Sequence, residues 1–356
     1  MQLKPWRWVL VGVVGCGGPL PPRPRAEVTL HGGHYGDNDH VSVWSPSVRA
    51  RVPVGRRVTV SASYGVDIVS AASVDIVASA SRMNEVRHDT TAGAQVAVDD
   101  RTTVGVSGRD SRESDYLSDG VTLTVDRENA ARTRTLHVEA RGRWDRVGPG
   151  WVLQDRADLG VGTLAASLTQ VLDRLTVLRF ALQADVLSGY QASAYRYVPV
   201  GGQWFTEQVP ELRVRGSGSA RIQRSLRRNV SLLAEYGLSG DSWGLVAHSG
   251  EVGLRWEPAP WAMFDVRARV MAQNGASFYQ GTYASLTEYR TRDRMLGPME
   301  AFWPTASFRF DWPAWPAPPS WEVGVRGGWL HQQFEDFVPL RSRDAGTGEV
   351  WITRWF

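Results

Sequence analysis

Residues 58–68 read Val-Thr-Val-Ser-Ala-Ser-Tyr-Gly-Val-Asp-Ile and alternate between apolar and polar side chains along the whole stretch. A period of two is typical of a β-strand with one apolar and one polar face. The same alternation recurs in residues 136–144, 178–186, 212–222 and 264–270. From Ala26 onward this period dominates and helical spacing is absent, so the sequence predicts an all-β fold.

The length and polarity of these strands point to a membrane. Strands of soluble sandwiches commonly run five or six residues, whereas crossing a bilayer at a tilt takes about nine to eleven. The polar face carries charged side chains at a density that no packed core holds, so the apolar face is expected to meet lipid. An open sheet edge in hydrocarbon would leave unpaired backbone groups, which favours closure. The sequence therefore predicts a closed antiparallel transmembrane β-barrel.

Counting the alternating segments predicts about sixteen strands, an even number as bacterial single-chain barrels require. The expected strands are residues 26–36, 40–54, 57–70, 86–98, 101–112, 116–127, 131–146, 155–172, 175–188, 208–224, 228–240, 245–257, 261–274, 299–312, 320–333 and 348–356. Alternate connections are short, and the longer ones span 70–86, 189–207, 275–298 and 334–347. This asymmetry predicts short periplasmic turns and long extracellular loops.

Composition excludes several classes of protein. The 356 residues carry Lys+Arg 40 against Asp+Glu 37 and contain one cysteine. The net charge of +3, spread along the chain, does not suggest a nucleic-acid binder. A single cysteine rules out an internal disulfide framework and Cys-based metal sites. Beyond residue 16 no apolar run approaches the roughly 18 residues of a membrane-spanning helix.

The N-terminal residues resemble an export signal. Lys4 and Arg7 form a positive region, residues 8–15 an apolar region, and the Pro-rich residues 19–24 a linker. We expect a leader over residues 1–25 and a barrel domain over residues 26–356. Val13-Val14-Gly15-Cys16 is similar to a lipoprotein cleavage motif, which makes Cys16 a candidate for lipidation, the alternative being an incidental cysteine in a leader that is removed.

Phe356 ends the chain and shares a strand face with Ile352 and Val350. This pattern resembles the C-terminal signal by which outer-membrane barrels are recognised for insertion, except that Arg354 stands where the signal prefers an apolar residue. The expected location is the outer membrane of a Gram-negative bacterium, and the expected partners are outer-membrane lipid, lipopolysaccharide and, through Phe356, the barrel-assembly machinery.

Four short elements resemble a known family. They are Tyr64 to Ser73, Glu113-Ser114-Asp115-Tyr116, Asp241-Ser242-Trp243-Gly244 followed by His248, and Ser277-Phe278-Tyr279. Together they are similar to motifs of the outer-membrane proteins grouped as domain of unknown function 3570, and the similarity extends over nearly the whole chain after the leader. The resemblance implies the fold and the location, and it leaves the activity open. It also implies that genes of family members lie near genes for flavin-transferring and thioredoxin-like periplasmic proteins, so we expect a periplasmic or redox partner.

These elements fall at the end of the barrel that carries the long loops. The functional interpretation is a recognition or gating surface at the extracellular mouth, built from Asp67, Glu113, Asp115, Tyr116, Asp241, Trp243 and Tyr279. The alternative is that their Asp, Ser and Gly residues form turns and end strands.

Alternation also predicts which charged side chains line the lumen. The expected set is Arg49, Arg51, Arg141, Arg143, Arg179, Arg213, Arg215, Arg267, Arg269, Asp185, Glu235, Glu251 and Asp265. Arginine outnumbers carboxylate on this face, so the interior field is expected to favour anions modestly. The alternative is a ladder of cross-strand ion pairs that stiffens the wall.

No catalytic motif supports an enzyme strongly. Ser242 and His248 are a candidate nucleophile and base for a barrel hydrolase, with Asp241 or Asp67 orienting the imidazole, but alternation turns His248 outward. His31, His34, Asp37, Asp39 and His40 cluster in the first hairpin and could hold a divalent cation, although such a cluster is more often a solvated loop. We therefore expect no catalytic residue, no metal and no cofactor.

The sequence thus favours an outer-membrane β-barrel that forms a pore or transport passage for a small, anionic solute. Barrels of sixteen strands are wide enough for a channel. The alternatives are an outer-membrane enzyme acting at the outer leaflet and a barrel that sheathes a redox or other partner protein.

Overall fold

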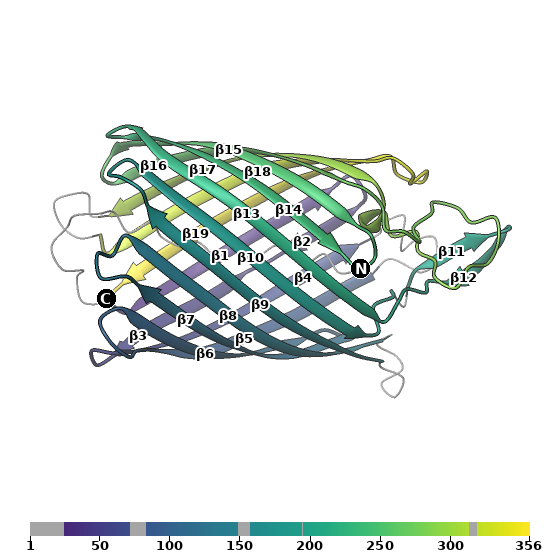
Figure 1. Cartoon of the computed structure of the whole chain (residues 1–356), viewed down its shortest axis with the longest axis horizontal. Helices are drawn as coiled ribbons and strands as arrows, with labels where there is room; N and C mark the ends of the chain where they lie inside the picture. Colours follow the sequence, from purple (N-terminus) through teal and green to yellow (C-terminus); the bar gives the residue numbers. More distant parts are fainter. Residues whose placement is uncertain (1–24, 72–82, 149–156, 194, 313–318) are drawn as a thin grey trace.

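The structure is a computed structural model and describes residues 25–71, 83–148, 157–193, 195–312 and 319–356. One antiparallel sheet contains every long strand and curls into a barrel (Figure 1). The sheet closes because β1 (Glu27–Asp37) pairs along its whole length with β19 (Ser342–Trp355). The first and last strands of the described residues are therefore neighbours.

The barrel of the described residues has sixteen strands, which confirms the predicted architecture. The second of these consists of two segments, β2 (Val41–Trp44) and β3 (Ser47–Val54), which both pair with β1 on one side and β4 on the other. The others are β4 (Val58–Ala71), β5 (Met83–Ala97), β6 (Thr102–Arg112), β7 (Tyr116–Glu128), β8 (Arg134–Val147), β9 (Ala157–Val171), β10 (Thr176–Gly189), β13 (Leu212–Arg227), β14 (Val230–Asp241), β15 (Val246–Ala259), β16 (Ala262–Gln273), β17 (Met299–Trp312) and β18 (Trp321–Phe334).

The break between β2 and β3 falls at Pro46, whose missing N–H cannot contribute to the ladder. The backbone stays paired around it: Ser45 exchanges hydrogen bonds with Gly33, and the Pro46 carbonyl accepts one from the N–H of Val66 at 3.0 Å. The interruption is therefore a local irregularity in one barrel strand.

Connections at one end, here called the short-turn end, are tight as predicted. In the β5–β6 turn the Asp99 carboxylate accepts the N–H of Arg101 at 2.7 Å, and in the β9–β10 turn Asp173 accepts the N–H of Leu175 at 2.7 Å. Asp is favoured in such turns because its side chain replaces a missing backbone partner. The two turns therefore share one geometry that the residue pattern specifies.

The opposite end, here called the loop end, holds the longer connections. The β10–β13 connection contains a separate hairpin of β11 (Tyr197–Val200) and β12 (Gln203–Thr206), and the β16–β17 connection contains a 3₁₀ turn at Arg294–Leu296. Figure 1 shows the hairpin extending beyond the barrel. Among the described residues, no helix is long and apolar enough to cross a membrane.

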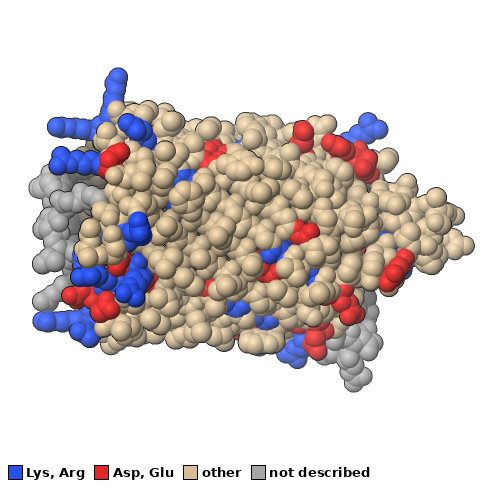
Figure 2. Space-filling view, viewed as in Figure 1, with Lys and Arg blue, Asp and Glu red and all other residues tan. Residues whose placement is uncertain are grey.

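The outer wall is apolar. Exposed side chains such as Leu182, Val252 and Val270 alternate along their strands with polar residues on the inner face. Figure 2 shows that charged atoms on the visible face gather at the two ends, with a largely uncharged wall between them. This inside-out polarity agrees with the prediction from alternation.

Aromatic or histidine side chains mark both limits of this wall. On β15 the limits are His248 and Trp256, and on β18 they are Trp329 and Trp321, eight residues apart in each strand. At about 3.3 Å per residue and a tilt near 40°, that spacing corresponds to roughly 20 Å along the barrel axis. The apolar wall is thus a band of even height.

The observed strand limits agree with the predicted ones within a few residues except in two places. β13 begins at Leu212 rather than 208, because residues before it belong to the hairpin connection. β19 begins at Ser342 rather than 348: polar residues 342–347 suggested a loop, yet their backbone pairs with both β18 and β1. The expected leader at 1–25, including Cys16, lies outside the described residues apart from Arg25.

Candidate functional site

The Asp241–Gly244 element folds into a compact turn between β14 and β15 at the loop end. Asp241 Oδ1 accepts the backbone N–H groups of Trp243 at 2.9 Å and Leu245 at 3.1 Å. Ser242 Oγ accepts the N–H of Val214 at 3.0 Å, which ties the turn to β13. Gly244 has a φ of +87°, a conformation that favours glycine. Each residue of the motif therefore has a structural role in this turn.

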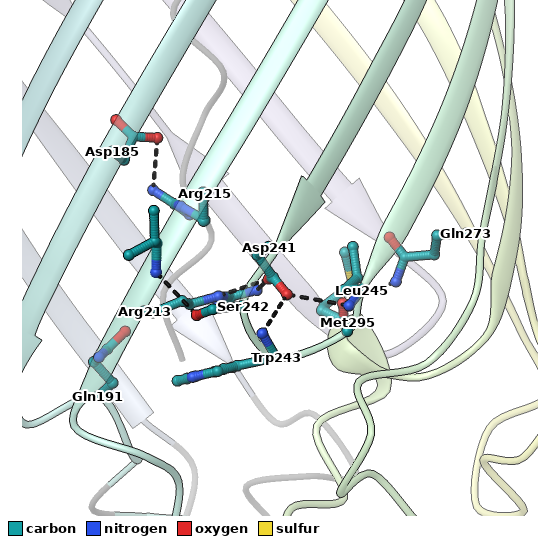
Figure 3. Close-up of polar contacts among 12 residues, drawn as sticks. Asp185, Gln191, Arg213, Arg215, Asp241, Ser242, Trp243, Leu245, Gln273 and Met295 are labelled. Carbon is teal, nitrogen blue, oxygen red and sulfur yellow. Dashed lines mark hydrogen bonds and ion pairs between the residues drawn. The ribbon is translucent and has the colours of Figure 1, made fainter.

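The same element holds an arginine at the mouth. Arg213 Nε donates to Asp241 Oδ2 at 2.8 Å, while its guanidinium carbon lies 4.1 Å from the centroid of the Trp243 ring. Trp243 is buried, donates through Nε1 to the Leu212 carbonyl and packs edge-on against Phe278. Figure 3 shows the indole beneath Arg213 and the carboxylate beside it. Salt bridge and cation–π contact together fix the guanidinium.

A second group of predicted mouth residues lies around β4 to β8. Arg87 bridges Asp67 and Glu113, the Arg87 to Glu113 distance being 3.5 Å. Tyr116 donates to Asp145, and Ser114 donates to Glu85 at 2.6 Å. Burial raises the pKa of the Glu113 carboxyl, although the Arg87 guanidinium opposes the shift.

Carboxylate oxygens of Glu85, Glu113 and Asp115 lie within 4.8 Å of one another. The predicted mouth residues thus form two groups, this one and the Asp241–Trp243–Tyr279 group, with β9, β10 and β13 between them in the sheet. Tyr279 packs in the second group with Trp243 and Phe278.

Sequence reasoning missed a third structure at the mouth, formed where the β10–β13 and β16–β17 loops fold together. Buried Arg196 contacts Glu207 at 3.0 Å and Asp293 at 3.2 Å. Residues 208 and 290 exchange two backbone hydrogen bonds, and Thr291 donates its hydroxyl to Glu207. The run Arg290-Thr291-Arg292-Asp293-Arg294 could have indicated this structure, because three arginines in five residues need acidic or polar partners if the segment is buried.

The β16–β17 loop is anchored to the first hairpin through Arg294. Its Nη2 lies 2.6 Å from Asp39 Oδ2, and each of the two residues is 1% exposed. The guanidinium also lies 5.3 Å from the Phe334 ring centroid and 5.8 Å from that of Phe337. Gln273 adds two hydrogen bonds to the Met295 and Gly297 carbonyls. The loop is therefore held against the barrel on several sides.

The predicted lumen residues share the inner face, and most of the charged ones are paired. The ion pairs include Arg141–Glu139, Arg143–Asp145, Arg213–Asp241, Arg215–Asp185, Arg221–Glu235, Arg255–Asp265, Arg267–Glu251 and Arg267–Asp265. Arg179 faces Arg221 in the adjacent strand, and Arg269 faces Glu251. The pairs Arg141–Glu139, Arg143–Asp145 and Arg267–Asp265 each lie within one strand, whereas the other ion pairs join neighbouring strands, so cross-strand pairs are present on β10 and on β13 to β16.

Arg49 and Arg51 differ from these. Both are exposed on the inner face of β3, and within the described residues neither has a carboxylate within salt-bridge distance, while Arg51 donates to Gln95 at 3.0 Å. Arg51 lies opposite Glu27 of β1 without forming an ion pair, and the half-buried Arg179 also has no ion pair among the described residues, so Arg49 and Arg51 are the exposed members of the predicted set that lack a salt-bridge partner.

Exposure of the inner face changes along the barrel. At the loop end Ser118, Asp145, Met299 and Arg343 are almost fully buried. Nearer the short-turn end Arg49, Arg51 and Ser61 are exposed, and the Arg141 side chain is 47% exposed. Asp265 and Thr353, on the inner face near the short-turn end, are also buried, so the interior is packed at the loop end and accessible over part of the wall toward the short-turn end.

The candidate hydrolase pair does not assemble. Ser242 is held by the backbone of Val214, whereas His248 lies on the outer wall with its Nδ1 2.6 Å from the Tyr236 hydroxyl. Asp67, the alternative orienting residue, contacts Arg87 instead.

The His and Asp residues of the first hairpin are also dispersed. His31 lies 3.9 Å from Glu349, the tilted rings of His34 and Trp44 have centroids 4.4 Å apart, and Asp37 accepts the N–H groups of Asp39 and Val41. Asp39 is paired with Arg294. These side chains serve different contacts and do not converge on a shared position.

Solved structures of outer-membrane barrels resemble this fold. A bacterial polysaccharide outer membrane secretin has a TM-score of 0.57 and 9% identity, covering 94% of this chain and 99% of its own. CdiB from Acinetobacter baumannii has a TM-score of 0.50 and 8% identity, covering 93% and 60%. The siderophore receptor PirA from Pseudomonas aeruginosa has a TM-score of 0.47 and 10% identity, covering 88% and 57%.

The present chain thus spans less than two thirds of the last two proteins, and identities this low bear on the fold alone. A search of curated proteins finds no significant match. Of the four elements that resemble the family, the Asp241–Gly244 and Ser277–Tyr279 elements fall inside the matched segment, and those at 64–73 and 113–116 fall outside it. Residues 151–304 match the family model described as Protein of unknown function (DUF3570), which confirms the resemblance over the segment that runs from before β9 into β17.

Proposed function

We propose that this barrel lies in the outer membrane of a Gram-negative bacterium and forms a passage for a small polar solute. The apolar outer band, bounded by aromatic side chains and roughly 20 Å high, suits the hydrocarbon of an outer membrane, for which bands of about 25 Å are usual. Sixteen tilted strands enclose a lumen wide enough for more than packed side chains.

The observation that carries the proposal is the change in exposure along the inner face. Charged side chains such as Arg49, Arg51 and Arg141 remain accessible inside the barrel toward the short-turn end. Polar side chains in contact with water inside a barrel are what an aqueous passage requires.

Packing at the loop end defines where such a passage narrows. The folded loops around Arg196, Glu207 and Arg294 and the Arg213–Trp243 contact occupy that end. In the proposed orientation the loop end faces the cell exterior, so a solute meets the constriction first and a wider vestibule on the periplasmic side.

Charge favours an anionic solute. Most of the inner arginines pair with a neighbouring carboxylate, whereas Arg49 and Arg51 are exposed and have no ion pair among the described residues. A few fixed positive charges in a confined lumen raise the local concentration of anions.

Conductance of the purified chain in a planar bilayer tests the proposal. We expect discrete openings and a reversal potential, measured under a salt gradient, that favours anions and approaches zero as salt screens the wall. Absence of any conductance, both in the full chain and in a variant whose β16–β17 loop is released by Arg294→Met, would reject a passage.

A further inference from the structure

Exposed arginines are concentrated on the turns at the short-turn end. They are Arg56 and Arg57 between β3 and β4, Arg101 between β5 and β6, Arg132 between β7 and β8, Arg174 between β9 and β10, and Arg227 and Arg228 at the β13–β14 turn. Figure 2 shows Lys and Arg side chains of the visible face gathered at this end and projecting from it.

The acidic residues of the same turns pair with one of these arginines, Arg132, among the described residues. Asp99 and Asp173 accept backbone N–H groups within their own turns, and Glu128 lies 3.5 Å from Arg132. Within the described part of the chain, no ion pair engages the other six turn arginines named above. Their guanidinium groups are therefore available to an external anion.

These arginines lie directly at the edge of the apolar band. Val54 and Val58 flank the Arg56–Arg57 turn, and the exposed Leu172 and Leu175 flank Arg174. Leu226, also exposed, precedes Arg227. An arginine whose stem lies along apolar surface while its head reaches a polar layer is typical of a membrane interface.

The arginines occupy only part of the rim. The neighbouring turns toward β19 carry aromatic residues instead, with Trp256 and Trp261 beside the β15–β16 turn and Trp312 and Trp321 at the ends of β17 and β18. Trp261 packs edge-on against Phe310 and Trp256 stacks on Phe264. Tryptophan suits the interface irrespective of lipid charge, whereas arginine favours an anionic headgroup.

We propose that the turn arginines from β3 to β14 bind the phosphate groups of anionic phospholipids in the leaflet at the short-turn end. The turns have only two to five residues, so their guanidinium groups stay at the depth of the lipid headgroups. An acidic protein partner would need a basic surface that projects further into solution, so the short turns favour lipid as the binding partner. The inference requires that the barrel is inserted in a membrane, and it does not require that the barrel conducts.

Association of spin-labelled lipids with the full chain in mixed phosphatidylglycerol and phosphatidylcholine vesicles tests the proposal. We expect the wild-type protein to prefer phosphatidylglycerol, with up to about fivefold preference for each arginine in contact with a headgroup, falling as salt is raised. Replacing Arg56, Arg57, Arg227 and Arg228 by Gln should remove most of that preference.

The matched control is R49Q/R51Q, which removes two charges from the inner face seven residues or fewer from the Arg56–Arg57 turn. This control should retain the preference, whereas R56Q/R57Q should lower it. Heat-modifiable mobility establishes that each variant is folded before lipid binding is compared. Equal association of the two lipids with the wild-type protein, or an unchanged preference in the fourfold variant, would overturn the proposal and would leave an acidic protein as the remaining class of partner.

Discussion

Replacing Arg294 by Met is expected to release the β16–β17 loop from the barrel mouth. The side chain and its partner Asp39 are both almost fully buried, with 2.6 Å between Nη2 and Oδ2. Removing one partner of a buried ion pair typically costs about 3 to 5 kcal/mol. Loss of the cation–π contacts with Phe334 and Phe337 adds on the order of 0.5 to 2 kcal/mol.

A loss of about 3 kcal/mol corresponds to a change of more than 100-fold in the equilibrium between docked and released loop. Hydrogen exchange followed by mass spectrometry reports this equilibrium directly, because the N–H groups of Leu296 and Gly297 are bonded within the docked turn. We expect exchange of residues 290–297 to accelerate by a similar factor, and single-channel conductance to rise because the mouth is less obstructed.

The double variant R294M/D39L separates loss of the anchor from general damage. Replacing a buried ion pair by apolar residues of similar size is often neutral, so the double variant should restore slow exchange. Unchanged exchange of residues 290–297 in Arg294→Met would refute the reasoning that this ion pair holds the loop.

Three further outcomes are expected. R49S/R51S should shift the reversal potential under a salt gradient toward cations, whereas R221Q/E235Q, which removes an ion pair and no net charge, should leave it unchanged. Burial raises the pKa of Glu113, so ionisation of this carboxyl lowers the stability of the fold as pH rises through that pKa. Glu113→Gln should therefore raise the Tm at pH 7 to 8 and have little effect on the Tm below the ordinary Glu pKa of about 4.3. An equal change in Tm at both pH values would contradict the burial of a charged Glu113 as the cause. Deleting Phe356 should lower the yield of heat-modifiable barrel in the outer membrane if this residue carries the insertion signal, and an unchanged yield would show that it does not.

The barrel was predictable because its determinants are local. Alternation of apolar and polar residues identifies each strand, and turn residues such as Asp99 and Asp173 specify the tight connections. The number of strands and the alternation of apolar and polar residues then predict that the sheet closes into a barrel and which side chains face its interior. The start of β19 was not predictable in this way, because residues 342–347 are held by backbone pairing with β18 and β1 and carry no apolar repeat.

The sequence predicted which residues lie at the mouth of the barrel, but it did not predict which side chains contact one another there. Asp67, Glu113, Asp241 and Trp243 do lie at the loop end, and arginines of adjacent strands pair with the two aspartates, Arg87 of β5 with Asp67 and Arg213 of β13 with Asp241. The Arg294–Asp39 contact joins residues 255 positions apart, and no periodicity signals such a pair. Loop packing of this kind depends on tertiary structure, which the strand pattern leaves open.

Substituted-cysteine accessibility tests most directly whether the inner face lines a water-filled passage. Ser61 lies on the inner face of β4 and Val60 on the outer wall, and Cys16, the only cysteine of the chain, can be replaced by Ser beforehand. We expect a charged, membrane-impermeant methanethiosulfonate reagent to react with Ser61→Cys in planar bilayers and to lower conductance stepwise, while Val60→Cys is unaffected. Reaction at Val60→Cys with none at Ser61→Cys, or labelling of Ser61→Cys with no change in conductance, would contradict a conducting lumen.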